Sequence, residues 1–488
     1  MFSQHYKALL RHLGSFLRIP ALLCLPTFVV IIVFREWFAV PAFAVLLVLT
    51  FGIGQFLFVR FRHHTHLPAS SAFGLIALTW LLVTVAGIIP YYGVALTGHS
   101  GCREFLDLNS AFFESMSGFT GTGLTMVKKP ANLPHCLQWW RSVTEWSGSL
   151  GMIFIAVAFL RKKKEIDKIY TAETNSFDID GDYPKTIGKI WWMYVLFTAL
   201  SILAFAGAGM PVWEAFNHGL TAISTGGFSV RNDSFTSYPL PVLVTGNIII
   251  VIGAISFKVY YLMLFKWQFR KAWRQTQLRY FGTLLLGLIS LLLMFNRPEN
   301  WIHNTFQAAS AIGTCGLNTV PVQGWPLPAV LLLTIAMNLG GNADSTAGGL
   351  KTARLAWLLK HLRAQIWQTL APNEKSSDYP VQFDGRAVDH NEKNEEVLQA
   401  LNFLLLWLVA GLAGCLVLSL LLPDQFSLSD ILFEVSSALN NVGLSIGITD
   451  HALRPAAKWT LIVLMWIGRL EIYAVVVLLY GVFGRKPR

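Results

Sequence analysis

The sequence predicts an all-α integral membrane protein, with an N-terminal two-helix hairpin followed by four repeats in pseudo-fourfold arrangement. Each repeat is expected to contain a helix, a re-entrant loop and a second helix. The prediction rests on the composition, on ten long apolar runs and on a short motif that occurs four times. Of the 488 residues, 54% are hydrophobic and only 13% are charged. A soluble domain has roughly a quarter of its residues charged, so this composition excludes soluble globular, disordered and fibrous proteins.

The ten apolar runs are candidate membrane spans, because a bilayer core of ~30 Å needs ~20 apolar residues per helix. They are Pro20–Phe34, Phe38–Val59, Ala69–Leu96, Leu137–Leu160, Ile187–Ala208, Leu240–Phe265, Tyr280–Phe295, Leu327–Leu358, Leu398–Leu422 and Ala457–Val482. Four shorter segments, rich in Ser, Thr and Gly, follow the third, fifth, seventh and ninth runs. These segments are too short and too polar to span a membrane.

The distribution of positive charge predicts the orientation. If the N-terminus is cytoplasmic, 27 of the 38 Lys and Arg residues lie on the cytoplasmic side, 8 lie outside and 3 lie within spans. Cytoplasmic segments of membrane proteins carry this excess of Lys and Arg, so both termini are expected in the cytoplasm. Basic residues before the first run also suit a signal peptide, but Arg35, Glu36 and Trp37 interrupt the apolar run, which favours a helical hairpin.

A motif of nine residues recurs in the four short segments. The copies read SGFTGTGLT, TAISTGGFS, SAIGTCGLN and SALNNVGLS, and they align on Gly123, Gly227, Gly316 and Gly443. Every copy has Ser or Thr six residues before the glycine and a bulky apolar residue after it. One copy alone is equally typical of a short connecting helix closed by a C-cap glycine. Four copies, each between two spans, indicate a fourfold internal repeat.

Four re-entrant segments around one axis predict a cation pore. Non-helical backbone at membrane depth is tolerated only inside protein or along a water-filled cavity. Glycine permits backbone angles that turn a carbonyl inward, and a ring of carbonyl oxygens can replace the hydration shell of a monovalent cation. The half-helix before each glycine directs its negative C-terminal end toward the membrane centre. Because the aligned strings contain no carboxylate, we expect dipoles to provide the attraction.

The predicted boundaries divide the chain into six parts. Residues 1–66 form the hairpin, 67–168 the first pore repeat, 169–275 the second, and 276–365 the third with an intramembrane gating loop. Residues 366–396 form a mobile cytoplasmic connector, and 397–488 form the fourth repeat.

With these motifs, and with GGNADSTAGGLKTAR and WIGRLEIYAVVVLL further along the chain, the sequence resembles the Trk/Ktr/HKT superfamily of potassium transporters, specifically the membrane subunit of bacterial Trk-type uptake systems. The resemblance implies a homodimer in which each protomer has its own potassium pore. It also implies a potassium-binding selectivity filter made by the carbonyls just before and at each glycine. Those residues are Gly121, Thr122, Gly123, Thr225, Gly226, Gly227, Thr314, Cys315, Gly316, Asn441, Val442 and Gly443. Glycine at all four aligned positions is similar to potassium-selective members.

Below the filter, the resemblance implies a gating loop that blocks the pore and moves on activation. Its residues are Gly340, Gly341, Asn342, Asp344, Ser345, Thr346, Gly348 and Gly349. Glycines and polar residues interrupt an otherwise apolar span here, which a membrane tolerates around a cavity. A glycine-rich helix-packing site is the alternative. AGGLKT lacks the adjacent Gly-Lys of a phosphate-binding loop.

Arg469 lies inside the last span, where a charge costs ~2.5 to 3.5 kcal/mol on insertion scales. The resemblance makes it an electrostatic barrier below the filter, paired with Asp344 or Glu471, while a structural ion pair between helices is the alternative. Lys258 and Arg141 are also charged residues within spans. For Arg141, we expect the long side chain to reach outward to the membrane surface.

The function predicted from these features is potassium uptake across the plasma membrane, with a cytosolic nucleotide-binding regulatory subunit as partner. The chain itself is expected to bind no cofactor and no nucleic acid. A sodium/potassium symporter, or another ion-coupled secondary transporter with a midplane site, is the alternative. An intramembrane enzyme is disfavoured because HExxH, GxSxG and clustered carboxylates are lacking.

Two smaller features leave alternatives open. His63, His64 and His66 are more typical of a solvated juxtamembrane patch than of a metal or pH-sensing site. Cys102 and Cys136 fall in one external region, where a disulfide is compatible with the sequence but unpaired thiols are favoured.

Overall fold

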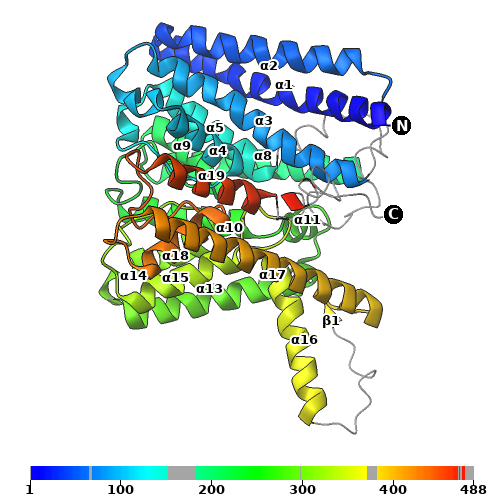
Figure 1. Cartoon of the computed structure of the whole chain (residues 1–488). Helices are drawn as coiled ribbons and strands as arrows, with labels where there is room; N and C mark the ends of the chain where they lie inside the picture. The colour runs from blue at the N-terminus through cyan, green and yellow to red at the C-terminus, as the bar shows by residue number, and fades with distance from the viewer. Residues whose placement is uncertain are drawn as a thin grey trace.

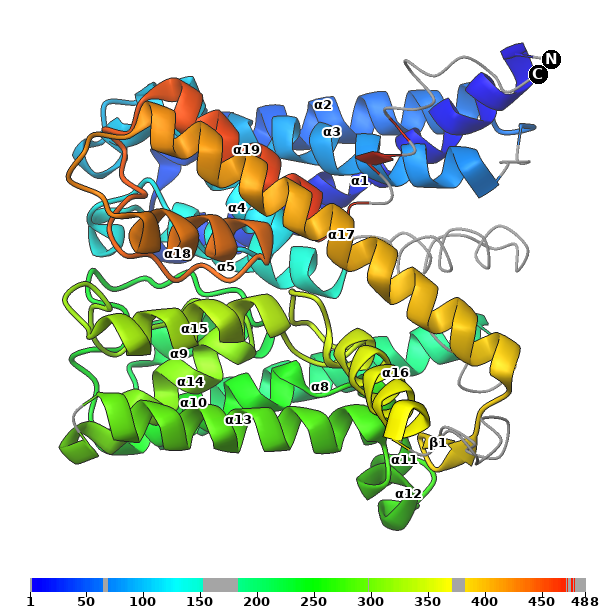
Figure 2. The ribbon, with the colours of Figure 1, turned by 60° about the horizontal axis from the view of Figure 1, so that its bottom comes forward.

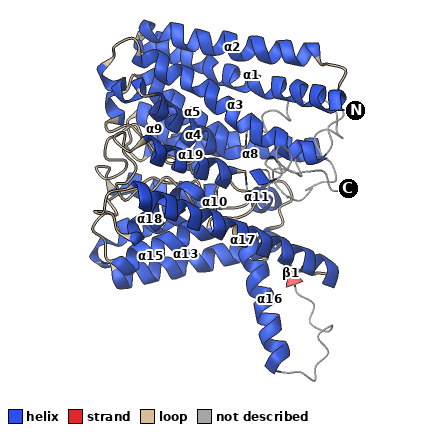
Figure 3. Cartoon of the chain, viewed as in Figure 1, coloured by secondary structure: helices blue, strands red, loops and turns tan. Residues whose placement is uncertain are grey.

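The computed structural model describes residues 2–64, 69–151, 183–296, 298–370, 382–470, 472, 475, 476 and 478. Within these ranges the protein is almost entirely helical (Figure 3). The strands described are β1 (Gln382–Phe383) and β2 (Arg386–Ala387), which pair antiparallel with Gln382 opposite Ala387. The predicted all-α membrane fold is therefore confirmed.

Two long helices form the N-terminal hairpin, at the top of Figure 1. Helix α1 (Phe2–Phe34) runs through Pro20 and Pro26, so it begins well before the apolar run that predicted it. It packs along α2 (Val40–Arg60). Gly14 and Gly54 bring the two backbones together, since a Cβ added to either glycine would lie 2.7 Å from the carbonyl oxygen of the other. Small residues at helix contacts allow this close approach in membranes.

Each of the four repeats contains a first helix, a short helix and a second helix. In the first repeat they are α3 (Ala69–Ala95), α4 (Leu108–Thr120) and α5 (His135–Leu150). In the second they are α8 (Tyr183–Gly207), α9 (Val212–Ile223) and α10 (Leu240–Ala254). The third has α13 (Thr276–Phe295), α14 (Trp301–Ile312) and α15 (Leu327–Leu339). The fourth has α17 (His390–Leu421), α18 (Leu428–Leu439) and α19 (Pro455–Arg469).

Six of the described helices are long and apolar enough to cross a membrane, or seven if α10 and the helix after it count as one bent span. The sequence predicted ten spans, of which the eighth is interrupted by the gating loop, and the difference lies in the second helix of the repeats. Helix α10 is followed, after a bend of 96°, by α11 (Phe257–Leu264). Helix α15 stops at Leu339, where Gly340 caps it at a φ of 69°. The predicted continuous run Leu240–Phe265 is thus wrong as a single helix, because hydropathy reports the solvent and not the continuity of the backbone. The break in Leu327–Leu358 agrees with the interruption that its glycines and polar residues predict.

Beyond α15, a non-helical loop leads into α16 (Thr352–Leu370), which projects from the body of the molecule (Figure 1). The short helix α12 (Phe269–Trp273) and the β hairpin lie at the same end (Figure 2). Phe383 stacks on Trp357 of α16 with ring centroids 4.1 Å apart. The described part of the predicted mobile connector therefore contains a packed hairpin that the sequence did not indicate.

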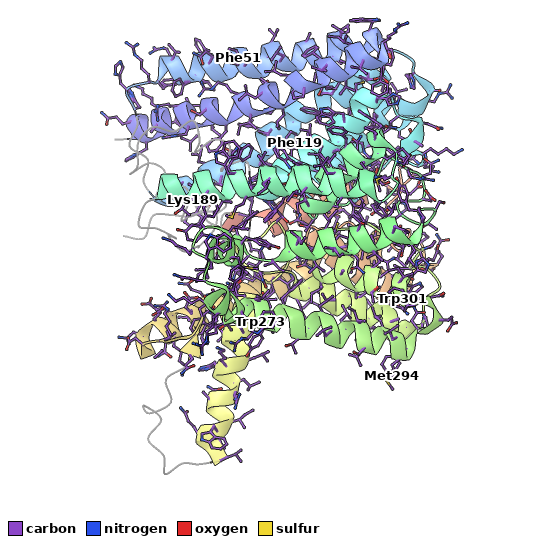
Figure 4. All side chains as sticks on the ribbon, turned by 180° about the vertical axis from the view of Figure 1, so that it is seen from behind. Phe51, Phe119, Lys189, Trp273, Met294 and Trp301 are labelled. Carbon is purple, nitrogen blue, oxygen red and sulfur yellow. The ribbon has the colours of Figure 1, made fainter. Side chains whose placement is uncertain are left out.

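The surface and the interior have the polarity of a membrane protein. In Figure 4, Phe51 and Met294 lie on the outer surface, and they are 47% and 75% exposed. Phe119 is labelled among the central helices and is fully buried. The interior also holds many buried Ser, Thr, Asn and Gln side chains and several buried charges. In lipid, polar groups concentrate inside the bundle, so the functional site is expected there.

Candidate functional site: a ring of four re-entrant segments

The backbone after the short helix has the same conformation in all four repeats. Two residues before each aligned glycine, the chain is left-handed. The φ values are 68° at Gly121, 51° at Thr225, 51° at Thr314 and 53° at Asn441. The aligned glycines are also at positive φ: 86° at Gly123, 112° at Gly227, 77° at Gly316 and 97° at Gly443. A non-glycine residue at positive φ is uncommon, so three such residues at equivalent positions mark a specified geometry.

One hydrogen bond closes the end of each short helix in the same way. The N–H of the residue before the glycine donates to the carbonyl of the Ser or Thr six residues before the glycine, at 2.8 to 2.9 Å. The pairs are Thr122 with Ser117, Gly226 with Thr221, Cys315 with Ser310 and Val442 with Ser437. This is the six-to-one bond of a Schellman-type helix end. The repeated motif thus encodes a helix terminus that turns sharply into an extended segment.

The four segments meet in a closed ring. A Cβ added to Gly123 would lie 2.3 Å from the carbonyl oxygen of Gly226 in the next repeat. The same holds from Gly227 to Cys315 at 2.2 Å, from Gly316 to Val442 at 2.4 Å and from Gly443 back to Thr122 at 2.2 Å. Each glycine is therefore packed against the carbonyl that precedes the next glycine. The twelve residues implied by the resemblance come from four distant parts of the chain, and these contacts bring the four segments together in a ring.

A polar side chain nine residues before each glycine holds the segment that follows the ring. Glu114 accepts a hydrogen bond from the Met126 N–H at 2.9 Å, and Glu434 accepts one from the Ile446 N–H at 3.1 Å. In the other two repeats, His218 Nε2 lies 2.9 Å from Ser229 Oγ, and Gln307 Nε2 donates to the Val320 carbonyl at 2.9 Å. The sequence reasoning missed these four residues. A polar residue at the same place in all four copies was the signal that could have found them.

Arg141 also helps to hold the segments that follow the ring. Its guanidinium pairs with Glu114 at 2.7 Å and donates to the Ser229 carbonyl at 2.9 Å, so it links the first repeat to the second. Both side chains of the pair are 1% exposed or less. The expectation that Arg141 reaches outward is wrong, because a carboxylate inside the bundle compensates its charge more closely than the membrane surface could.

The predicted gating loop is a non-helical segment that contacts the base of the ring. Thr314 Oγ1 accepts from the Gly348 N–H at 2.6 Å, and Thr225 Oγ1 lies 3.1 Å from Thr346 Oγ1. A Cβ on Gly348 would lie 2.1 Å from the carbonyl oxygen of Asn440. The loop is thus held against three of the four repeats, through the left-handed residues of two of them.

The other polar residues of the loop fix its shape. The Asn342 N–H donates to the Ala254 carbonyl at 3.0 Å, and Asn342 Oδ1 accepts from Thr352 Oγ1 at 2.6 Å. The Ser345 hydroxyl donates to the Asn342 carbonyl at 2.6 Å. The Asp344 carbonyl accepts from the Phe257 N–H at 2.8 Å, so the loop also contacts the start of α11.

Gly340, Gly341 and Gly349 allow the two ends of the loop to approach each other. A Cβ on Gly340 would lie 2.3 Å from the Gly348 carbonyl oxygen, and one on Gly341 would lie 2.5 Å from the Ala347 Cβ. Gly349 has a φ of 81°. These glycines serve a tight loop and not the packing of a continuous helix.

Arg469, the last residue of α19, faces the first repeat. It donates to the Ser149 carbonyl at 2.8 Å, and its guanidinium carbon lies 5.4 Å from the centre of the Trp80 ring. Ser149 also borders the ring, since a Cβ on Gly121 would lie 2.3 Å from the Ser149 Oγ. Arg469 is therefore connected to the ring through Ser149, which contacts both. Pairing with Asp344 or Glu471 stays a prediction, and Glu471 lies outside the described residues.

Smaller predictions have mixed outcomes. Cys102 and Cys136 are free thiols, so the disulfide alternative is not realised. Lys258, predicted within a span, lies on α11 and pairs with Asp384 of the β hairpin at 2.8 Å. His66 lies outside the described residues. Within the ranges that the structure describes, no three His, Cys, Asp or Glu residues could hold a metal ion together.

The sequence also matches a known protein family. The family model TrkH, described as a cation transport protein, matches residues 39–296 and 290–481. The chain belongs to this family. The resemblance to Trk-type transporters is thus confirmed, and the family is one of transport proteins and not of enzymes.

Relatives are similar over nearly the whole chain. The Trk system potassium uptake protein TrkH of Salmonella typhimurium is 28% identical over 506 residues, covering 99% of this chain and 100% of the relative. The Trk system potassium uptake protein TrkG of Escherichia coli is 28% identical over 509 residues, covering 100% of both. The crystal structure of the potassium transporter TrkH from Vibrio parahaemolyticus superposes with a TM-score of 0.83 at 25% identity, covering 98% of this chain and 100% of that one.

Proposed function

We propose that the protein takes up potassium across the plasma membrane through the ring of four re-entrant segments. The closed contact of each glycine with the carbonyl of the next repeat carries this proposal. Carbonyl oxygens around a narrow axis can replace the water of a monovalent cation. A membrane potential that is negative inside supplies about 2.3 kcal/mol per charge per 100 mV and drives the ion inward. The names of the similar potassium uptake proteins favour potassium as the substrate.

We further propose that the loop of residues 340–349 is the gate. Its hydrogen bonds to Thr225 and Thr314 hold it against the cytoplasmic side of the ring. Arg469 adds a positive charge next to the first repeat, close to Ser149 and Gly121. Movement of the loop away from the two threonines would open the path.

The partners and the orientation follow from the same proposal. We expect a homodimer with one pore per protomer, a cytosolic nucleotide-binding regulatory subunit, and both termini in the cytoplasm. The described segments predicted to be cytoplasmic, including the start of α1, α12 and α16, lie at one end of the molecule (Figure 2), which is compatible with this orientation. A coupled symporter is the second candidate, and the uptake experiment separates the two.

Purified protein in liposomes tests the function. With a potential that is negative inside, wild-type protein should accumulate radioactive rubidium without any proton or sodium gradient. Uptake that requires such a gradient would support the symporter instead. Gly123→Ser places a side chain against the Gly226 carbonyl, so it should lower the ratio of rubidium to sodium uptake. An unchanged ratio and rate in this variant would contradict the filter assignment.

A further inference from the structure

A carboxylate lies directly against the ring but is not one of the proposed filter residues. Glu145 is on α5 and is fully buried. Both of its carboxylate oxygens accept from the Phe228 N–H, at 3.1 and 3.0 Å, just after the second filter glycine. A Cβ added to Gly226 would lie 2.2 Å from the Glu145 Cδ, and one added to Gly123 would lie 3.2 Å from Oε1. The side chain therefore contacts two of the four filter segments.

Nearby positive charge does not neutralise Glu145. Arg141, one helical turn earlier, is paired with Glu114 at 2.7 Å, so that pair has no net charge. In the part of the chain that the structure describes, no Lys, Arg or His nitrogen lies within 4.0 Å of a Glu145 oxygen. A buried charge without a compensating partner costs several kcal/mol. A cation in the adjacent ring would offset part of that cost.

The second and fourth repeats carry no such charge at the equivalent place. Gly148, Gly253 and Gly468 align the second helices, because a Cβ on each would lie 2.1, 2.6 and 1.9 Å from the last carbonyls of α4, α9 and α18. Three residues before these glycines stand Glu145, Ile250 and Met465. The two apolar residues are fully buried. The charge is thus not a feature that the first repeat shares with the second and fourth.

We propose that Glu145 carries a negative charge when a cation occupies the adjacent ring, and that this charge behind the filter backbone sets the affinity of the ring for potassium. This inference rests on the proposed function and adds an affinity-determining residue to it. A unit charge about 10 Å from an ion, at an effective dielectric constant of ~20, changes ion binding by roughly tenfold. The charge acts through space, while the carbonyls remain the groups that touch the ion.

Two substitutions separate the charge from the hydrogen bond. Glu145→Gln removes the charge but keeps an oxygen to accept from the Phe228 N–H. Glu145→Met introduces the residue type of the fourth repeat and removes both. If the charge sets affinity, both variants should raise the KM for rubidium uptake in liposomes about tenfold, with little change in the maximal rate. Glu145→Gln with the wild-type KM, and a defect only in Glu145→Met, would overturn the proposal.

Controls make each outcome decisive. Glu395→Gln makes the same change at an exposed position on α17 and should leave the KM unchanged. Potassium-dependent stabilisation against heat, with choline as the reference salt, measures binding without transport and should shift in parallel with the KM. If Glu145→Gln cannot be purified, Glu145→Asp keeps the charge and shortens the side chain. Its KM should stay within about threefold of wild type, and a tenfold rise would contradict the charge role.

The wild-type protein distinguishes this inference from the function on which it rests. Wild-type protein that neither takes up rubidium nor gains stability from potassium would overturn the proposed function itself. Wild-type protein that does both, with a Glu145→Gln variant that behaves identically, would overturn only the role of Glu145.

Discussion

At the scale of single residues, Thr225 and Thr314 each belong to both the ring and the loop. Their left-handed backbone forms the base of the ring, and their hydroxyls contact Thr346 and the Gly348 N–H. A change in the loop therefore alters groups one or two bonds away from the filter backbone. The two sites are therefore coupled by direct contact, without a longer chain of intervening residues.

Removal of the Thr314 hydroxyl should weaken the closed state of the loop. In Thr314→Val the Gly348 N–H loses its acceptor, and an unsatisfied buried donor costs about 1–3 kcal/mol. We expect the rate of rubidium uptake by the liposomes to rise several-fold. Thr369→Val, at an exposed site on α16, is the matched control. A Thr314→Val rate equal to that of wild type would show that this contact does not hold the gate.

Arg469 offers a second test at the same scale. Arg469→Ala removes the positive charge beside Ser149 and Gly121, so a cation crossing this level meets less repulsion. Rubidium uptake should become faster, and the voltage dependence of uptake should become less steep. Arg469→Lys keeps the charge and should retain most of the barrier. A silent Arg469→Ala variant would assign the residue to helix packing against Trp80.

Some of these residues could be predicted from the sequence and others could not. The filter glycines stood out because the backbone demands them four times in the same string. Glu145 did not, because the contact that matters joins it to Phe228, 83 positions away, and no local pattern marks that contact. Arg141 was placed wrongly for the same reason, since its partner Glu114 was not recognised in the preceding helix.

At the scale of elements, the breaks in the second helices govern the arrangement around the ring. Helices α5, α10, α15 and α19 are 16, 15, 13 and 15 residues long. The last turns of α5, α10 and α19 lie against the last carbonyls of the short helices, at Gly148, Gly253 and Gly468. The apolar pattern predicted where lipid-facing segments lie. Hydropathy alone does not show the breaks, because glycines and bends change the backbone path without changing it. The glycines of residues 340–349 did predict the break after α15, whereas the bend between α10 and α11 was not predicted.

The β hairpin contacts the element that follows one of these breaks. Asp384, at the hairpin turn, pairs with Lys258 of α11 at 2.8 Å and accepts from the Thr276 N–H at 2.9 Å. Helix α11 in turn contacts the gating loop, where the Phe257 N–H donates to the Asp344 carbonyl. The hairpin is therefore connected to the gating loop through α11 by direct contacts alone.

Asp384→Asn should loosen this attachment without disturbing the hairpin turn. Asp384 has a φ of 52°, a conformation that Asn also tolerates, so the substitution removes mainly the charge. Loss of a charge-assisted contact costs about 1.5–3 kcal/mol. Amide hydrogen exchange measured by mass spectrometry should become roughly tenfold or more faster in residues 382–387 and at the start of α13. Unchanged exchange in Asp384→Asn, relative to an Asp424→Asn control far along the chain, would contradict this attachment.

At the scale of the whole molecule, the ring requires that the fourth repeat return to the first. Asn441 Nδ2 donates to Thr122 Oγ1 at 2.9 Å, inside the ring. Nearer the other end of the helices, Lys458 of α19 pairs with Asp107 at 2.7 Å and contacts Ser110 Oγ at 2.8 Å. The sequence predicted the number of repeats and their pseudo-symmetry. It could not predict which side chains close the circle, because those pairs are more than 300 positions apart.

Acid should weaken this closing contact. Burial alone would raise the pKa of Asp107, but hydrogen bonds from Lys458, Asn109 and Ser110 outweigh it and hold the pKa well below its usual value. A carboxyl with a lowered pKa in the folded protein stabilises it fully above its unfolded pKa of about 4, and this contribution falls as the pH drops toward the folded pKa. Wild-type protein should therefore lose stability below about pH 4 more steeply than Asp107→Asn.

A double-mutant cycle on Asp107 and Lys458 tests whether this contact holds the ring closed. Asp107→Asn keeps a residue that can cap α4, so it removes the charge and not the helix cap. It leaves Lys458, only 2% exposed, without its carboxylate, and we expect a loss of about 2–3 kcal/mol at neutral pH. Breaking a fully buried pair costs more, but the Asp107 side chain is 41% exposed.

Lys458→Met removes the buried charge, so in the double variant most of the stability should return. Unfolding in mixed detergent micelles measures the four proteins, and rubidium uptake should follow the same order, because a ring that opens between the fourth and first repeats cannot select the ion. Effects of the two single substitutions that simply add would mean that the pair does not act as one contact, and closure would then depend on Asn441 and Thr122 alone among the contacts considered.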